Sequence, residues 1–196
     1  KNISKNLILS NSGEAIIVKN DTTKGILLRG YKNADFSKLQ IFDNNLFIGN
    51  NKILSKNYIS IGKELSFTLG LDIGDSITIM SSAGIKTIIG NLPKQKTFIV
   101  SSIFESGMAE FDNNVGFINL KTLEEFLNLN ERNRNLEIYL NNPQNIDYQK
   151  SIVQNNFPND FVYSWSDMNR SLFSALKVER NVMFIILSLI IIVAAF

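Results

Sequence analysis

Cysteine and histidine are both absent from the 196 residues of the sequence, and each absence excludes a class of chemistry. Without cysteine, the chain can form no disulfide and has no thiolate nucleophile. Without histidine, it lacks the imidazole of a Ser-His-Asp triad and, together with cysteine, the usual ligands of a zinc ion. The commonest zinc sites and hydrolytic sites are therefore excluded.

An excess of one charge is also missing, because 20 basic side chains stand against 18 acidic ones and the formal net charge is +2. So small a net charge gives no electrostatic footprint for nucleic acid, and we expect no nucleic-acid partner. Hydrophobic residues make up 44% of the chain, as in a globular protein. The length fits one domain or two small ones.

Acidic residues near Gly107 are the first candidates for a chemical site. Glu105, Glu110 and Asp112 lie close together in the sequence, but their spacing matches no EF-hand, and acidic residues beside glycine are usually turn or cap residues. The glycines of Gly70–Gly74 are not followed by the Lys-Ser/Thr pair of a phosphate-binding loop. A Ser-Lys dyad fits the composition, yet no serine is marked as its nucleophile. We expect a protein that is not an enzyme, with no catalytic, metal-binding or cofactor-binding residues.

The C-terminal segment 182–196 is apolar over fifteen residues, with a single hydroxyl. A membrane-spanning helix needs roughly 20 apolar residues, so the segment is either a buried core helix or the start of a transmembrane helix. We favour the transmembrane helix, because the segment has no polar stripe of helical period. Lys177, Glu179 and Arg180 would then lie on its water side. Since the N-terminus also reads as internal sequence, we expect residues 1–181 to be an extramembrane domain of a longer, permease-like protein.

Hydrophobic patterning predicts a mixed fold of strands and helices. Up to about residue 54 the apolar runs are short and strand-like, and farther along strands alternate with helices, which indicates helices packed on a sheet. A last helix, capped by Ser166, is expected to continue into the apolar segment. The predicted strands are 15–18, 25–28, 47–48, 59–61, 76–80, 97–104, 115–119, 136–140 and 161–165, and the predicted helices are 63–69, 120–129 and 145–156.

Residues 81–96 interrupt this pattern with a stretch that reads as a long two-armed hairpin. Four large aliphatic residues lie among glycines here: Ile85, Ile88, Ile89 and Leu92. If the hairpin projects, it exposes an apolar patch of the kind that marks a binding site. The alternative is an ordinary hairpin whose isoleucines fold back onto the core.

Several segments together resemble the lipoprotein-releasing permeases of ABC transporters, the LolC/LolE/LolF type within the MacB and FtsX-like permease group. The resemblance covers roughly residues 59–196, and before them only Ile26-Leu-Leu-Arg-Gly30 matches a family element. The segments that carry it are Ile61-Gly-Lys-Glu-Leu65, Leu69-Gly-Leu-Asp-Ile-Gly-Asp-Ser-Ile-Thr78, Phe104-Glu-Ser-Gly-Met-Ala-Glu-Phe-Asp112, Trp165, Ser171-Leu-Phe-Ser-Ala-Leu176 and Glu179-Arg-Asn-Val-Met-Phe-Ile-Ile-Leu187.

This resemblance implies an α+β fold, a MacB-like periplasmic domain with a porter-like α/β subdomain and a second, mostly β subdomain. The domain would comprise residues 1–181, with the two subdomains interleaved, and residues 182–196 would begin a truncated transmembrane helix. The family implies an inner-membrane location, with this domain in the periplasm of a Gram-negative bacterium.

The family also implies the partners. A cytoplasmic ATPase of the LolD type would drive the membrane helices, beside a second permease subunit that is the same or related. The domain would pass lipoprotein substrates from the membrane to a periplasmic lipoprotein chaperone of the LolA type. No cofactor is implied.

The site that the resemblance implies is a projecting hook with a small polar pad at its base. Residues 81–93 have the length of the hook, and Pro93-Lys-Gln-Lys96 resembles the motif at its end, although Lys96 stands where the family has arginine. Together with the phenylalanine-led motif that begins at Phe104, the hook suggests the F-type. The expected partner-binding residues are Ile85, Lys86, Thr87, Ile88, Ile89, Gly90, Asn91, Leu92, Pro93, Gln95 and Lys96.

Two other functions remain open from the sequence. One is a MacB-like efflux permease, in which the domain transmits mechanical force and contacts an adaptor protein. The other is an FtsX-like scaffold that regulates a wall hydrolase. The long hook favours lipoprotein export over efflux, and co-purification partners would discriminate all three functions.

Overall fold

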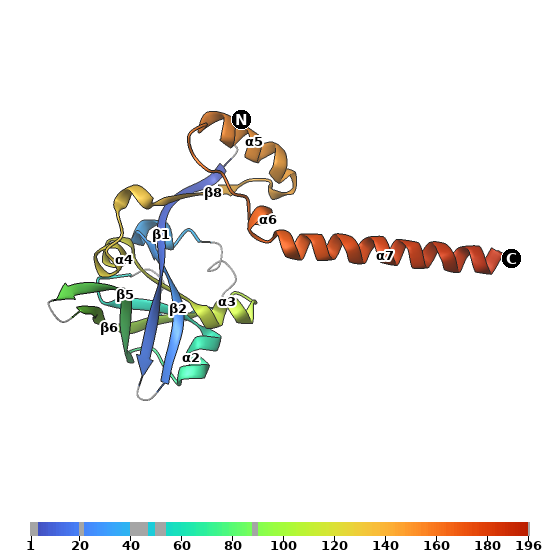
Figure 1. Cartoon of the computed structure of the whole chain (residues 1–196). Helices are drawn as coiled ribbons and strands as arrows, with labels where there is room; N and C mark the ends of the chain where they lie inside the picture. The colour runs from blue at the N-terminus through green and yellow to red at the C-terminus, as the bar shows by residue number, and fades with distance from the viewer. Residues whose placement is uncertain (1–3, 20–21, 40–46, 50–53, 88–89, 196) are drawn as a thin grey trace. The chain divides into compact units, whose positions relative to one another are not determined.

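A computed structural model describes residues 4–19, 22–39, 47–49, 54–87 and 90–195 (Figure 1). The predicted turn at residues 43–45 lies outside them. The elements are β1 (Ser4–Lys19), β2 (Thr22–Tyr31), α1 (Asn33–Phe36), β3 (Phe47–Gly49), β4 (Tyr58–Gly62), α2 (Lys63–Leu69), β5 (Ser76–Thr87), β6 (Gly90–Phe104), α3 (Ala109–Asn114), β7 (Val115–Asn119), α4 (Leu120–Leu127), the 3-10 helix η2 (Glu131–Asn133), β8 (Asn135–Leu140), the 3-10 helix η3 (Pro143–Asn145), α5 (Ile146–Asn156), α6 (Trp165–Met168) and α7 (Arg170–Ala195).

Six of the strands close into a ring. The strands follow the order β2-β7-β4-β6-β5-β1, and β1 pairs again with β2. The pairs β2–β7 and β4–β6 are parallel, whereas β1–β2, β1–β5, β5–β6 and β4–β7 are antiparallel. β8 and β3 lie outside the ring and pair with β1 and β6. Closure pairs the edges of these strands with one another, so the ring is a mixed barrel.

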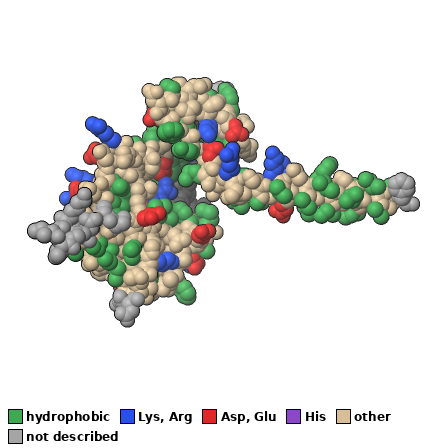
Figure 2. Space-filling view, viewed as in Figure 1, with side chains coloured by type: hydrophobic (Ala, Val, Ile, Leu, Met, Phe, Trp, Pro, Cys, Tyr) green, Lys and Arg blue, Asp and Glu red, His purple; other side chains and the backbone are tan. Residues whose placement is uncertain are grey.

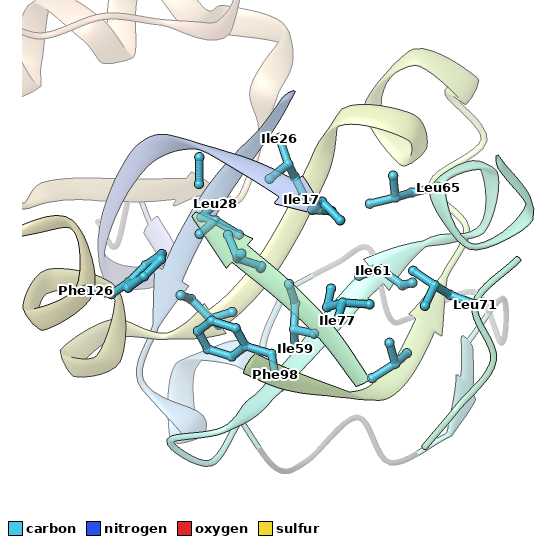
Figure 3. Packing of buried hydrophobic residues seen from close by; sticks show 14 of the residues in the cluster. Ile17, Ile26, Leu28, Ile59, Ile61, Leu65, Leu71, Ile77, Phe98 and Phe126 are labelled. Atoms are coloured by element: carbon cyan, nitrogen blue, oxygen red, sulfur yellow. The ribbon is translucent and has the colours of Figure 1, made fainter. Parts of the chain in front are cut away.

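The interior of the barrel is filled by aliphatic and aromatic side chains, because alternate residues of each strand point inward. Ile17, Ile59 and Phe98 belong to this core cluster, part of which Figure 3 shows. Residues of α2 and α4 complete this core, and Gly116 leaves it room, since a Cβ on that residue would lie 2.9 Å from Ile26. A second cluster, which includes Tyr31, Phe36, Phe104 and Phe117, lies apart from the first.

The helices that cover the barrel begin and end at positions that the sequence marks. Asn119 caps α4 by accepting hydrogen bonds from the backbone N–H groups of Lys121 and Thr122, at 3.1 and 3.4 Å. Asn128 ends α4 in the left-handed conformation, with φ of 56°, so the helix stops two residues before the predicted end at residue 129. Gly70 ends α2 in the same conformation, as expected.

The chain divides into two compact units, residues 4–139 and a unit that contains residues 140–195. The second unit holds α5, α6 and α7. The Nζ of Lys150 in α5 lies 2.7 Å from the carboxylate of Asp167 in α6. The domain boundaries expected from the sequence remain a prediction.

Two expectations for the second unit are wrong. Residues 161–164 form no strand, and Trp165 begins α6 instead, because the hydroxyl of Ser164 and the carboxylate of Asp167 form a reciprocal capping box. Ser164 therefore caps this helix, not Ser166. The long helix α7 is a separate element that begins at Arg170.

The long helix α7 is continuous through the apolar segment, as predicted. It extends for 26 residues, from Arg170 to Ala195, and its length and composition suit a membrane span. None of the residues in its most apolar window is buried, and hydrophobic side chains cover it along its length in Figure 2. An exposed helix of this kind is not a core helix.

Candidate partner-binding site

The residues expected to form the hook continue the barrel strands β5 and β6 as a two-stranded hairpin. Its arms are joined in the pairs Gly84–Pro93, Ile85–Leu92, Lys86–Asn91 and Thr87–Gly90. The register shifts between Met80 and Gly84, which marks an irregularity where the hairpin leaves the barrel wall. Below we call residues 84–93 the hairpin.

The predicted site residues fall into three groups. Ile88 and Ile89 lie outside the described residues. The backbone of Ile85, Lys86, Thr87, Gly90 and Asn91 forms the hairpin strands. The side chains of Leu92, Pro93, Gln95 and Lys96 are placed on β6, and 56% of Leu92 is exposed to solvent. The backbone pairing of the two hairpin arms is thus as predicted, whereas the binding role of the hairpin remains a prediction.

An open groove of about 500 Å³ lies at the base of the hairpin. One wall is residues 92–96 of β6, and the other wall is three residues of α4, Thr122, Glu125 and Phe126. Phe126 is 5% exposed and packs edge-on against Phe98, with ring centroids 6.1 Å apart. The groove therefore has an apolar floor that belongs to the barrel core.

Two lysines, Lys94 and Lys96, line this groove. The Nζ of Lys94 donates a hydrogen bond to the backbone carbonyl of Glu125, 3.2 Å away in the last turn of α4, where a cation is favourable. The Nζ of Lys96 lies 5.3 Å from the centre of the Phe98 ring. Partial burial lowers the pKa of Lys96 and the charge of Lys56 lowers it further, whereas Glu125 opposes both effects.

The α4 wall was missed by the sequence interpretation. Thr122, Glu125 and Phe126 follow a helical pattern that indicates only packing, and β6 is more than 25 residues earlier in the chain. Only the fold brings the two segments together.

Two of the acidic residues near Gly107 make contacts within the fold. The carboxylate of Asp112 is 2% exposed and accepts the backbone N–H of Ser106 at 3.0 Å with both oxygens. Glu105 pairs with Lys63 at 3.0 Å. Among the described residues, no group of acidic side chains is arranged to hold a metal ion.

Comparisons with known proteins were made for the whole chain. No protein-family model matches it. It is 31% identical over 174 residues to the lipoprotein-releasing system transmembrane protein LolC of Xylella fastidiosa, a match that covers 87% of this chain and 42% of the relative. It is 28% identical over 198 residues to LolC of Neisseria meningitidis serogroup B, covering 99% of this chain and 46% of the relative. The chain spans less than half the length of these relatives.

The fold is shared with a solved structure, the periplasmic region of MacB from Actinobacillus actinomycetemcomitans. The TM-score is 0.51 at 9% identity, and the match covers 88% of this chain and 77% of the other. The expected MacB-like α+β fold class is thereby confirmed.

The fold and the relatives together define the chain as part of an ABC-transporter permease subunit. It is placed in the inner membrane, with its folded domain in the periplasm. Within that class it is related to the lipoprotein-releasing permeases of the LolC type, as the sequence resemblance predicted.

Proposed function

We propose that this protein is a subunit of a transporter that extracts lipoproteins from the inner membrane and transfers them to a soluble periplasmic chaperone. The observation that carries the proposal is the hairpin, a two-stranded extension of β5 and β6 that presents Leu92 to solvent. An exposed aliphatic side chain on an extended hairpin has no role in the core and suits an apolar contact with another protein.

In this proposal, ATP hydrolysis is carried out by another subunit and not by this chain. A LolD-type ATPase would hydrolyse ATP in the cytoplasm, and a second permease subunit would complete the transporter. The periplasmic domain would then bind and position, using Ile85, Ile88, Ile89 and Leu92 as apolar anchors, with Gln95 and Lys96 at the base. Residues 86, 87, 90, 91 and 93 would form the rest of the hook.

The relatives support this proposal more than either alternative. LolC is named for lipoprotein release, and four LolC proteins are 28–31% identical to the chain over 82–99% of its length. The likeness to MacB, at 9% identity, concerns the fold alone. Lipoprotein transfer is therefore the function that we propose, before efflux or wall-hydrolase regulation.

The proposal is tested by capture of a LolA-type chaperone by the full chain in detergent. Burying one large aliphatic side chain is worth about 1.5–3 kcal/mol, so Leu92→Asp should weaken capture at least tenfold and Ile88→Asp with Ile89→Asp should abolish it. Phe67→Asp is the matched control, because this α2 side chain is 86% exposed and does not belong to the hairpin.

The thermal melting midpoint of each variant separates binding from folding. Capture that is unchanged in the hairpin variants, with an unchanged midpoint, would refute the role of the hairpin. A lower midpoint would show that the isoleucines pack in the core. Failure of the unmodified chain to bind the chaperone would refute the proposed function.

A further inference from the structure

The strand β8 joins the barrel unit to the unit that contains the long helix α7. The division between the two units falls inside this strand, between Tyr139 and Leu140. β8 lies outside the ring, and among the described strands it pairs with β1 alone. A strand held along one edge is weakly attached, because a two-stranded ribbon is only marginally stable by itself. Further contacts are therefore needed if β8 is to stay on the barrel when α7 moves.

Glu137 in β8 supplies such contacts. Its carboxylate accepts hydrogen bonds from the guanidinium of Arg29 at 2.7 Å and the hydroxyl of Tyr31 at 2.9 Å, both on β2. It also accepts one from the hydroxyl of Ser10 on β1 at 2.5 Å. The pair with Arg29 is little screened by solvent, because only 19% of the Glu137 side chain is exposed. Glu137 thus fastens β8 to β2, and below we call these four residues the Glu137 joint.

The joint is fixed on the barrel side by the second buried cluster. Tyr31 is 1% exposed, and its ring lies 5.8 Å from the ring of Phe117 on β7. Side chains in a close-packed interior move with their surroundings. A displacement of β8 should therefore pass through Glu137 to the barrel wall, and the hairpin that extends β5 and β6 should move with it.

On the other side of Leu140, a series of contacts links the helices of the second unit. The Nζ of Lys150 in α5 lies 2.7 Å from the carboxylate of Asp167 in α6. The ring of Trp165 in α6 packs edge-on against Phe173 in α7, with centroids 5.0 Å apart. Packed side chains and ion pairs of this kind can carry a movement of α7 back to the start of the unit.

We propose that Glu137 is a positioning residue of the transport cycle, which holds β8 on the barrel so that movement of α7 displaces the hairpin instead of peeling β8 away. The inference rests on the proposed function, in which ATP hydrolysis by another subunit moves the membrane helices. The ion pair with Arg29 is the strongest contact of the joint, because both groups are charged. Glu137→Gln keeps the size of the side chain and an acceptor oxygen but loses this charge, so it should loosen the joint.

The first measurement tests the joint without any lipoprotein. Because the 196 residues contain no cysteine, Phe67→Cys on α2 and Tyr148→Cys on α5 place one spin label on each unit, at side chains that are 86% and 69% exposed. In the full chain in detergent, Glu137→Gln should broaden the distribution of label distances about twofold. The control Glu131→Gln changes a carboxylate that is 76% exposed and outside the joint, and it should leave the distribution unchanged.

The second measurement tests the consequence for transport. With the ATPase and the chaperone present and the permease in lipid vesicles, Glu137→Gln should lower the lipoprotein released per ATP hydrolysed about threefold, without changing the ATPase rate. The matched control is Asn119→Ala, which destabilises the barrel by removing the cap of α4 and does not touch the joint. It should leave this ratio unchanged. Equal ratios in the two variants would show that Glu137 only stabilises the fold.

The outcomes separate this inference from the proposed function. If the unmodified protein releases lipoprotein to the chaperone and Glu137→Gln matches it in either measurement, the inference is wrong and the proposed function stands. If the unmodified protein releases no lipoprotein, the proposed function fails and the transport role of Glu137 fails with it.

Discussion

Glu137 is the most heavily hydrogen-bonded carboxylate described in the structure. Its Oε1 accepts from the Oγ of Ser10 at 2.5 Å, the Nη2 of Arg29 at 2.7 Å and the OH of Tyr31 at 2.9 Å, and its Oε2 accepts from the OH of Tyr139 at 3.0 Å. Four donors from β1, β2 and β8 thus converge on one side chain. The cluster attaches β8, which is outside the ring, to the barrel.

We predict that Glu137→Ala lowers the free energy of unfolding by about 2–4 kcal/mol, because it leaves a partly buried guanidinium and two phenols without their acceptor. Glu131→Ala is the control. Its side chain is 76% exposed and its ion pair with Arg134 is weak, so the change should be below about 0.5 kcal/mol. Urea unfolding measures both, and equal effects would contradict the structural role of Glu137.

The two tyrosines of this cluster predict a loss of stability in alkali. Burial raises the pKa of Tyr31 and of Tyr139 far above the usual value of about 10. Above about pH 10 the unfolded chain therefore loses these protons while the folded chain keeps them, so stability is full below pH 10 and decreases as the pH rises further. The melting midpoint of the unmodified chain should decrease above about pH 10. The decrease should be less steep for Tyr139→Phe. The control is Tyr148→Phe, which changes an exposed ring and should follow the unmodified chain.

The cap of α4 shows how one residue fixes an element that lines the groove. Asn119 accepts two backbone N–H groups of α4, and its own Nδ2 donates to the carbonyl of Leu54 at 3.2 Å. We predict that Asn119→Ala costs about 1–2 kcal/mol of stability. Asn119→Asp keeps the capping oxygen and loses only the donor, so it should cost less. If the two substitutions have the same effect by urea unfolding, the cap does not stabilise α4.

Elements whose signals are local could be predicted from the sequence. The helix from residue 63 ends at Gly70, and the helix from residue 120 follows Asn119, because glycine and asparagine act on their nearest neighbours. The strand predicted at 161–165 is wrong because aromatic residues favour strands only where a neighbouring strand or core receives them, and here Phe161 is 88% exposed.

Long-range partners could not be predicted. Arg29 and Glu137 are 108 residues apart, and nothing in the sequence pairs them. The same holds for the groove, whose walls come from β6 and α4. The hairpin arms, by contrast, are local and glycine-rich, so their strand pairing could be predicted although the closed barrel that they extend could not.

At the scale of the whole molecule, α7 predicts how the protein behaves in cells. Its apolar side chains are exposed along a helix that suits a membrane span, and residues 170–181 carry the charges before the apolar segment. We predict that the full protein stays with the membrane pellet after a carbonate wash and leaves it only with detergent. Release by carbonate alone would contradict a membrane-spanning α7.

The pairing of β1 with β8 has a consequence for how such proteins can diversify. The unit of residues 4–139 starts with β1 and ends in β8, and Glu137 on β8 lies beside Ser10 on β1. Its two connections to the rest of the chain therefore leave from neighbouring strands. A unit with adjacent ends can be inserted into a host protein, or exchanged for another, without stretching the host backbone. The barrel unit could therefore be exchanged as a whole. A single recombination event of this kind could change the periplasmic partner of a transporter.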